Sequence, residues 1–151
     1  MAGKFRGQTT WDPPLIIFQI LTIQFLSYST LTLLVLIATI LSGYAPNCEH
    51  IFAAKMMRLG TARLTILAHI TNAFISAYLL KIFVERSKAC LDFSLTYYTI
   101  HFLLVWYYSR GLPDTFIWYF VNVISACIMC VTAEYLCRRE EMKLIPISAS
   151  V

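Results

Sequence analysis

Two cysteines, Cys127 and Cys130, have the spacing in this chain that most directly suggests chemistry. A C-x-x-C dithiol supports redox reactions when the neighbouring sulfur and a polarising environment lower the pKa of one thiol. The same small, soft side chains also fill interfaces between packed helices. The motif lies in a long uncharged stretch between Asp114 and Glu134. The choice between redox chemistry and helix packing therefore depends on the structure that this stretch forms.

Polar side chains recur inside the uncharged stretches of the sequence and form the second group of candidates. They are Gln19, Gln24, His69, Asn72, His101 and Asn122. A polar group at membrane depth is costly and therefore marks either a functional site or a hydrogen bond between helices. His69 and Asn72 are three residues apart and share one helix face. We expect structural hydrogen bonds, with a proton relay or polar substrate site of a small transporter as the alternative.

The remaining candidate chemistry is sparse. Cys90 and Cys137 lie next to basic residues, at the ends of uncharged stretches, where reversible S-palmitoylation occurs; an unmodified cysteine at the membrane interface is the alternative. The sequence holds no metal-ligand spacing, phosphate-binding loop or serine–histidine–acid arrangement. We therefore assign no catalytic residue, no cofactor and no metal.

The composition identifies the class of protein that must position these residues. Of 151 residues, 59% are hydrophobic and 13% are charged, against about 45–50% and about 25% in soluble domains. The mean hydropathy is +0.69. These values exclude a disordered chain, a nucleic-acid-binding arm and an ordinary cytosolic globule, and they predict a small polytopic membrane protein.

Charged residues divide the chain into membrane spans. Crossing a bilayer takes about 20 apolar residues, and the four uncharged stretches predict spans at about 15–41, 64–84, 93–109 and 115–137. All four are expected to be helices, because unpaired backbone groups are not tolerated in lipid. The fold class is therefore an all-α transmembrane bundle of four helices, forming one membrane domain over residues 1–151.

The distribution of lysine and arginine predicts the orientation of the bundle. The two tails and the 81–92 connector carry eight of these residues, and the other two connectors carry four. The positive-inside rule then places both termini in the cytosol.

Within the 42–63 connector, apolar residues at helical spacing suggest a short amphipathic helix or a plain connector. Ala2 replaces the glycine that N-myristoylation requires.

The span count also allows a four-span oxidoreductase using Cys127 and Cys130. Enzymes of the vitamin K epoxide reductase type, which this motif and span count resemble, keep a redox pair in the fourth span. They also need a relay pair of cysteines in a lumenal loop, where this chain has only Cys48. Packing of Cys127 and Cys130 in a helix interface is therefore the favoured interpretation.

Several short strings resemble the Sys-one family of small Golgi membrane proteins. They are Trp11-Asp12-Pro13 before the first span, Cys90-Leu91-Asp92-Phe93 at the third, and Glu134-Tyr135-Leu136-Cys137 at the end of the fourth. The resemblance covers almost the whole chain and is strongest from Cys90 to Pro146. It implies a multi-pass protein of the trans-Golgi network that is not an enzyme.

The same resemblance implies a partner and a site. Family members recruit an Arf-related small GTPase, whose N-terminus is acetylated, and support retrograde transport from endosomes to the Golgi. The cytosolic ends of the spans would form the binding rim. Its candidate residues are Trp11, Asp12, Arg86, Lys88, Asp92, Arg138 and Arg139. Asp92 is also expected to be the N-cap of the third span, and the arginines could set topology or bind anionic membrane lipid.

Overall fold

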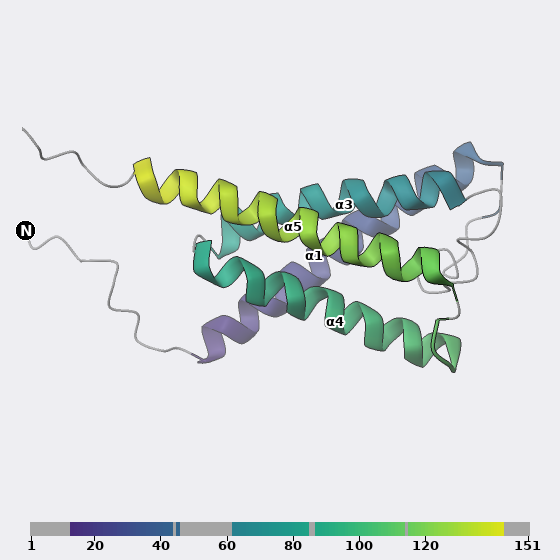
Figure 1. Ribbon diagram of the computed structural model, residues 1–151, viewed down its shortest axis with the longest axis horizontal. Helices are drawn as coiled ribbons and strands as arrows, with labels where there is room; N and C mark the ends of the chain where they lie inside the picture. Colours follow the sequence, from purple (N-terminus) through teal and green to yellow (C-terminus); the bar gives the residue numbers. More distant parts are fainter. Residues whose placement is uncertain (1–12, 44, 46–61, 85–86, 114, 144–151) are drawn as a thin grey trace, which may run out of the picture.

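The computed structural model describes residues 13–43, 45, 62–84, 87–113 and 115–143. Its four long helices are α1 (Pro13–Leu41), α3 (Ala62–Phe83), α4 (Cys90–Ser109) and α5 (Phe116–Lys143), and a short 3-10 helix, η2 (Ser87–Ala89), precedes α4. Figure 1 shows the long helices gathered into one elongated bundle. The described part of the chain contains no strand, so the prediction of an all-α bundle of four helices is confirmed.

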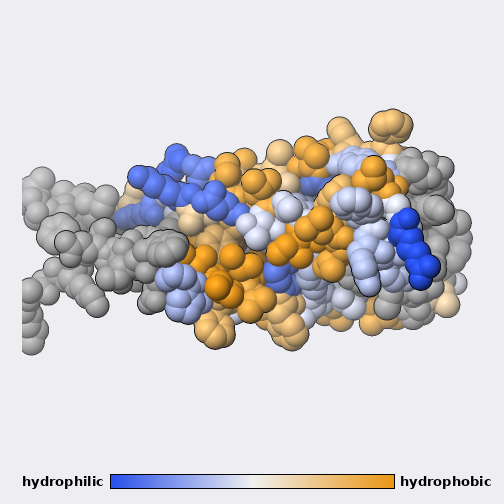
Figure 2. All heavy atoms as spheres, turned by 90° about the horizontal axis from the view of Figure 1, so that it is seen from below, coloured by the Kyte–Doolittle hydropathy of each residue, from blue (hydrophilic) through white to orange (hydrophobic). Residues whose placement is uncertain are grey.

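The outside of the bundle is apolar, as a protein that spans a membrane requires. Large side chains such as Phe25, Leu41 and Phe120 are more than two-thirds exposed, and Figure 2 shows hydrophobic residues along much of one face. Within the described residues, α1, α3 and α5 are long and apolar enough to cross a membrane. α4 has sufficient length but is less apolar, because it carries inward-facing polar residues that include Ser94 and His101.

The helix bounds follow the predicted spans closely, with the largest difference at the end of α5. We predicted a span ending at residue 137, and the helix continues to Lys143. The added residues, Arg-Arg-Glu-Glu-Met-Lys, are good helix formers, and the next helix-breaking residue is Pro146. The apolar run therefore ends before the helix does, and the last turns of α5 carry charge.

The predicted N-cap of the third span is wrong. α4 begins at Cys90, and its N-cap position is Ala89, which makes no side-chain capping bond. The preceding 3-10 turn of η2 leads directly into the helix, which places Asp92 inside the first turn. Its negative charge still interacts favourably with the positive end of the helix dipole.

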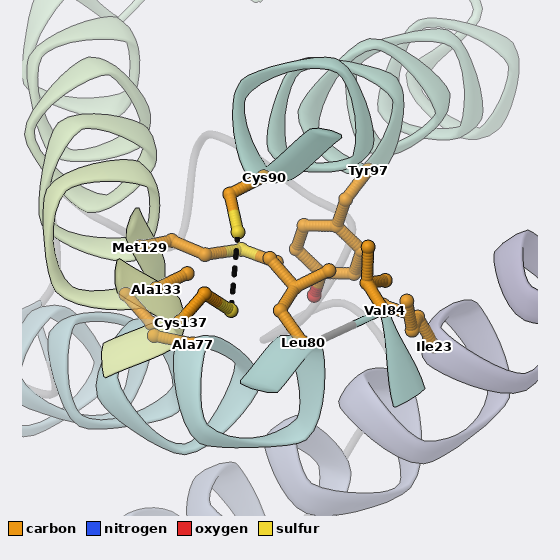
Figure 3. Close-up of a cluster of buried hydrophobic side chains, with 10 residues drawn as sticks. Ile23, Ala77, Leu80, Val84, Cys90, Tyr97, Met129, Ala133 and Cys137 are labelled. Atoms are coloured by element: carbon orange, nitrogen blue, oxygen red, sulfur yellow. Dashed lines mark hydrogen bonds between the residues drawn. The ribbon is translucent and has the colours of Figure 1, made fainter. Parts of the chain in front are cut away.

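Small residues on α3 allow the other helices to pack closely against it. Ala73 and Ala77, one turn apart, are completely buried, as are Met129 and Ala133 on α5. Spacing of this kind lets helix backbones approach in lipid, where van der Waals packing replaces the hydrophobic driving force. Figure 3 shows Ala77, Met129 and Ala133 in the same buried cluster. α3 packs extensively on both α1 and α5, so it is the central helix.

The start of α1 and the end of α5 lie at the same end of the bundle in Figure 1. The junction between α3 and α4 is at this end too, and the α4–α5 turn is at the other. At that turn, α4 closes with Arg110 in a left-handed conformation (φ 50°). The arrangement groups the charged helix ends, and their placement in the cytosol stays a prediction.

Candidate functional site

The candidate rim is formed by the helix ends around the junction between α3 and α4. Lys88 lies in η2, Asp92 in the first turn of α4, and Arg138 and Arg139 in the last turns of α5. These four predicted site residues therefore belong to neighbouring elements, because η2 packs on both α4 and α5. Trp11, Asp12 and Arg86 lie outside the described residues, as does the predicted amphipathic segment of the 42–63 connector.

Two carboxylates from α5 hold the rim together. Glu141 accepts hydrogen bonds from the backbone N–H and the hydroxyl of Ser87, at 3.0 and 2.8 Å. Glu140 forms an ion pair with Lys81 of α3, with 3.1 Å between Nζ and Oε1. The extension of α5 thus connects the end of α3 and the start of η2, and the loss of either contact would loosen the rim.

The two arginines of the rim differ in their surroundings. Arg138 forms an ion pair with Glu134, one turn earlier on the same helix. Arg139 is exposed and shares a helix face with Tyr135 and Met142, which are also exposed, at 64% and 62%. Positions 135, 139 and 142 follow helical spacing. We define these three residues as the α5 face; its apolar members were absent from the sequence-based site, although their spacing could have revealed them.

A second group of polar residues connects three helices inside the bundle. Thr30 of α1 donates to the side-chain oxygen of Asn72 on α3 at 2.6 Å, and Asn72 donates to the hydroxyl of Tyr97 on α4 at 3.4 Å. Close by, the hydroxyl of Tyr28 lies 3.2 Å from Nδ1 of His101. Hydrogen bonds of this kind hold helices together in lipid.

The expectation of hydrogen bonds between helices is therefore confirmed for Asn72 and His101. It also holds for Gln19, which donates to the backbone carbonyl of Phe83 at 2.8 Å. The expectation is wrong for Asn122, which bonds to a carbonyl of its own helix. His69 likewise contacts its own helix, with Nδ1 2.9 Å from the Thr65 carbonyl.

The ring of His101 is enclosed by aromatic neighbours. It stacks on Trp118, with ring centroids 6.1 Å apart and planes 20° apart, and it meets the ring of His69 edge-on at 6.2 Å. His101 is 2% exposed. Its contacts with α1, α3 and α5 give this side chain an evident role in assembling the bundle around α4.

The C-x-x-C motif does not form a packed interface. Cys127 is exposed and Cys130 is half-buried, so the packing prediction is wrong for Cys127. The reason is the helical phase of α5, whose buried stripe passes through Met129, Ala133 and Cys137 and leaves position 127 on the outer surface.

Cys90 and Cys137 are buried inside the bundle, which argues against S-palmitoylation at either residue. Their sulfur atoms lie 3.5 Å apart, and the residues are 0% and 1% exposed. Neither thiol is accessible to an acyltransferase in this arrangement. Among the residues that the structure describes, no cluster of three or more His, Cys, Asp or Glu could hold a metal ion.

The fold and the site define a small helical membrane protein, with a polar network inside the bundle and charged helix ends at one rim. Residues 6–147 match the family model SYS1, described as "Integral membrane protein S linking to the trans Golgi network". The chain belongs to the SYS1 family. No solved structure matches it.

Three relatives illustrate the similarity. The chain is 35% identical over 151 residues to Protein SYS1 homolog of Nematostella vectensis, covering 99% of this chain and 95% of the relative. It is 37% identical over 145 residues to Protein SYS1 homolog of Dictyostelium discoideum, covering 95% of this chain. It is 30% identical over 139 residues to Protein SYS1 of Saccharomyces cerevisiae, covering 90% of this chain and 68% of the relative.

The chain spans only 62% of the length of the Dictyostelium relative. The shared region is thus the helical membrane bundle together with its rim, and it does not extend over the whole of that longer protein. These relatives are named as proteins of one membrane family, with no catalytic activity in their names.

Proposed function

We propose that this protein is a multi-pass receptor of the trans-Golgi network that recruits an Arf-related small GTPase and so supports retrograde transport from endosomes. The observation that carries the proposal is the family match over residues 6–147, whose description names a link to the trans-Golgi network. The mode of action is binding, and no residue is assigned to catalysis.

Membrane anchoring explains why such a GTPase needs an integral partner. Stable attachment normally takes two signals, and even one myristoyl chain gives only marginal, reversible binding. A GTPase whose N-terminus is acetylated carries no myristoyl chain there, so its own affinity for the membrane is lower still. A membrane-embedded receptor supplies the missing binding energy as protein contact at the cytosolic surface.

The α5 face provides a suitable contact surface. Tyr135 and Met142 offer exposed apolar area on either side of the Arg139 guanidinium. Tyrosine, methionine and arginine are enriched in protein interfaces, and an amphipathic helix of the partner could lie along such a face. Lys88 and Asp92, at the neighbouring helix ends, would flank the bound helix.

Flotation of liposomes tests direct recruitment. The full-length chain, reconstituted in liposomes, should retain the acetylated GTPase, and Arg139→Glu should lower retention. Arg110→Glu is a matched control, because Arg110 lies at the other end of the bundle. Equal retention by liposomes with and without the chain would overturn direct recruitment.

Localisation in cells tests the same proposal independently. Removal of the chain should release the GTPase into the cytosol while a Golgi marker keeps its position. A GTPase that stays on the Golgi in those cells would contradict the proposed function, whatever the liposomes show.

A further inference from the structure

Cys90 and Cys137 bring two thiols from different helices into contact. Cys90 is the first residue of α4, and Cys137 lies six residues before the end of α5. Figure 3 shows their side chains pointing toward each other, with 3.5 Å between the sulfur atoms. Forming a disulfide requires the sulfurs to approach to about 2.05 Å, a shift that side-chain rotation and slight helix movement can supply.

The contacts on either side of the pair keep the two backbones in place. Ser87, three residues before Cys90, binds Glu141, four residues after Cys137. On the inner side, Leu80 and Met129 are fully buried against the thiols in the same cluster. The segments that carry the cysteines are thus aligned before any reaction occurs, and a bond between groups held in this way costs little entropy.

We propose that Cys90 and Cys137 are an oxidative modification site, at which hydrogen peroxide converts the two thiols into a disulfide that links α4 to α5. In the first step, the deprotonated sulfur of one cysteine attacks a peroxide oxygen. The O–O bond breaks, the sulfur becomes a sulfenic acid, and the departing hydroxide takes up the thiol proton to form water. Two electrons pass from the sulfur to the peroxide.

In the second step, the sulfur of the other cysteine attacks the sulfenic sulfur. The S–S bond forms, the S–O bond breaks, and the released hydroxide takes the second thiol proton to form another water. Overall, two thiols and one peroxide give one disulfide and two waters. The thiols lose two electrons in total, so a thiol reductant such as dithiothreitol reverses the change.

Access to the buried thiols comes from local opening of the rim. The bonds between Ser87 and Glu141 are exposed to solvent, and exposed contacts at the ends of elements open at lower free energy than the core. Hydrogen peroxide is small and uncharged, so transient separation of η2 from α5 is sufficient for entry. Reclosure then brings the second thiol onto the oxidised one.

Other cysteines compete for the oxidant, and the test must separate them. Cys127 is exposed and Cys130 is half-buried on the same helix, so Cys127 meets peroxide first. Accessibility therefore favours Cys127, and proximity of two thiols favours the Cys90–Cys137 pair. Only a map of the linked residues decides between these two outcomes.

The experiment uses the full-length chain in isolated membranes, treated with hydrogen peroxide and then with N-ethylmaleimide to block the remaining thiols. Mass spectrometry of digested protein should show a Cys90–Cys137 linked peptide, lighter by two hydrogen atoms than its separate thiol peptides and lost after dithiothreitol. Cys127→Ser with Cys130→Ser should leave this product unchanged, and Cys137→Ser should abolish it.

The wild-type map keeps the test independent of the variants, which could alter folding. A disulfide between Cys127 and Cys130 as the main product would overturn the proposal. So would separate oxidation of Cys90 and Cys137 to sulfinic acids, or the recovery of both as maleimide-labelled thiols.

Discussion

The carboxylate of Glu141 receives two hydrogen bonds from Ser87, one from its backbone N–H and one from its hydroxyl. The two residues are 54 positions apart, and their contact connects the last turn of α5 to the 3-10 helix that precedes α4. It fixes the distance between the segments that carry Lys88 and Arg139. This pair therefore contributes to the shape of the rim in addition to the packing of the helices.

Replacing Glu141 with alanine should loosen the rim without unfolding the bundle. The change removes a side-chain cap, and caps contribute about 0.5–2 kcal/mol, typically about 1. A loss of about 1 kcal/mol corresponds to about fivefold faster opening. Hydrogen exchange of residues 87–90 should accelerate by about this factor. Glu134→Ala, which removes a carboxylate that pairs within α5, should leave their exchange unchanged; equal acceleration in both variants would contradict the role of Glu141.

Asn72→Ala should destabilise the bundle more than Asn122→Ala. Asn72 bonds to Thr30 and Tyr97 on two other helices, and Asn122 bonds only within its helix among the contacts described. Hydrogen bonds between helices contribute about 0.6 kcal/mol on average in membranes, with a maximum of about 1.7. We expect a loss of about 1–2 kcal/mol for Asn72→Ala, measured by thermal unfolding in detergent. Similar losses for the two variants would show that the network does not join the helices.

His101→Ala should lower the amount of folded protein. The change removes the contact with Tyr28 and the stacking on Trp118, and it leaves a cavity that we expect to cost about 2–4 kcal/mol. His101→Phe keeps the ring and should recover most of the stability. Both variants should recruit the GTPase in proportion to their folded amount. A stable His101→Phe protein that fails in cells would instead favour the transporter alternative.

Simultaneous replacement of Cys127 and Cys130 by serine should leave the function intact. Cys127 is exposed on the outer surface of α5, and neither residue belongs to the rim. Trafficking of endosomal cargo to the Golgi in cells that express only the double variant measures this directly. Loss of transport with a normal protein level would favour the membrane oxidoreductase.

The sequence was sufficient to predict the helices, because the need for uncharged spans in lipid is a local property. The bounds of α1 and α3 differ from prediction by no more than two residues at each end. The end of α5 was missed because hydropathy reports where lipid ends, and helix propensity decides where the helix ends. Nothing in the local pattern could show that Ser87 meets Glu141, since that contact depends on how far α5 extends past α3.

The cysteines show more clearly that a local sequence pattern does not predict tertiary contacts. Their positions at span ends suggested acylation or an unmodified interfacial thiol for Cys90 and Cys137. The small, soft side chain suggested packing in a helix interface for Cys127. The outcome depends on helical rotation: a residue on α5 is buried if it continues the stripe of Met129 and Ala133. Span prediction gives the position of a residue along the helix axis and no rotation around it, so it could not tell which side of the helix each cysteine occupies.

The limited hydropathy of α4 has a consequence for how the chain is made. A segment that keeps Ser94, Tyr97 and His101 on one face gains little from entering lipid alone, because these groups have no partners there. The bonding and stacking partners of Tyr97 and His101 lie on α1, α3 and α5. During synthesis, we therefore expect α4 to enter the bilayer together with the helices that hold these partners, α1 and α3 before it and α5, which supplies Trp118, after it.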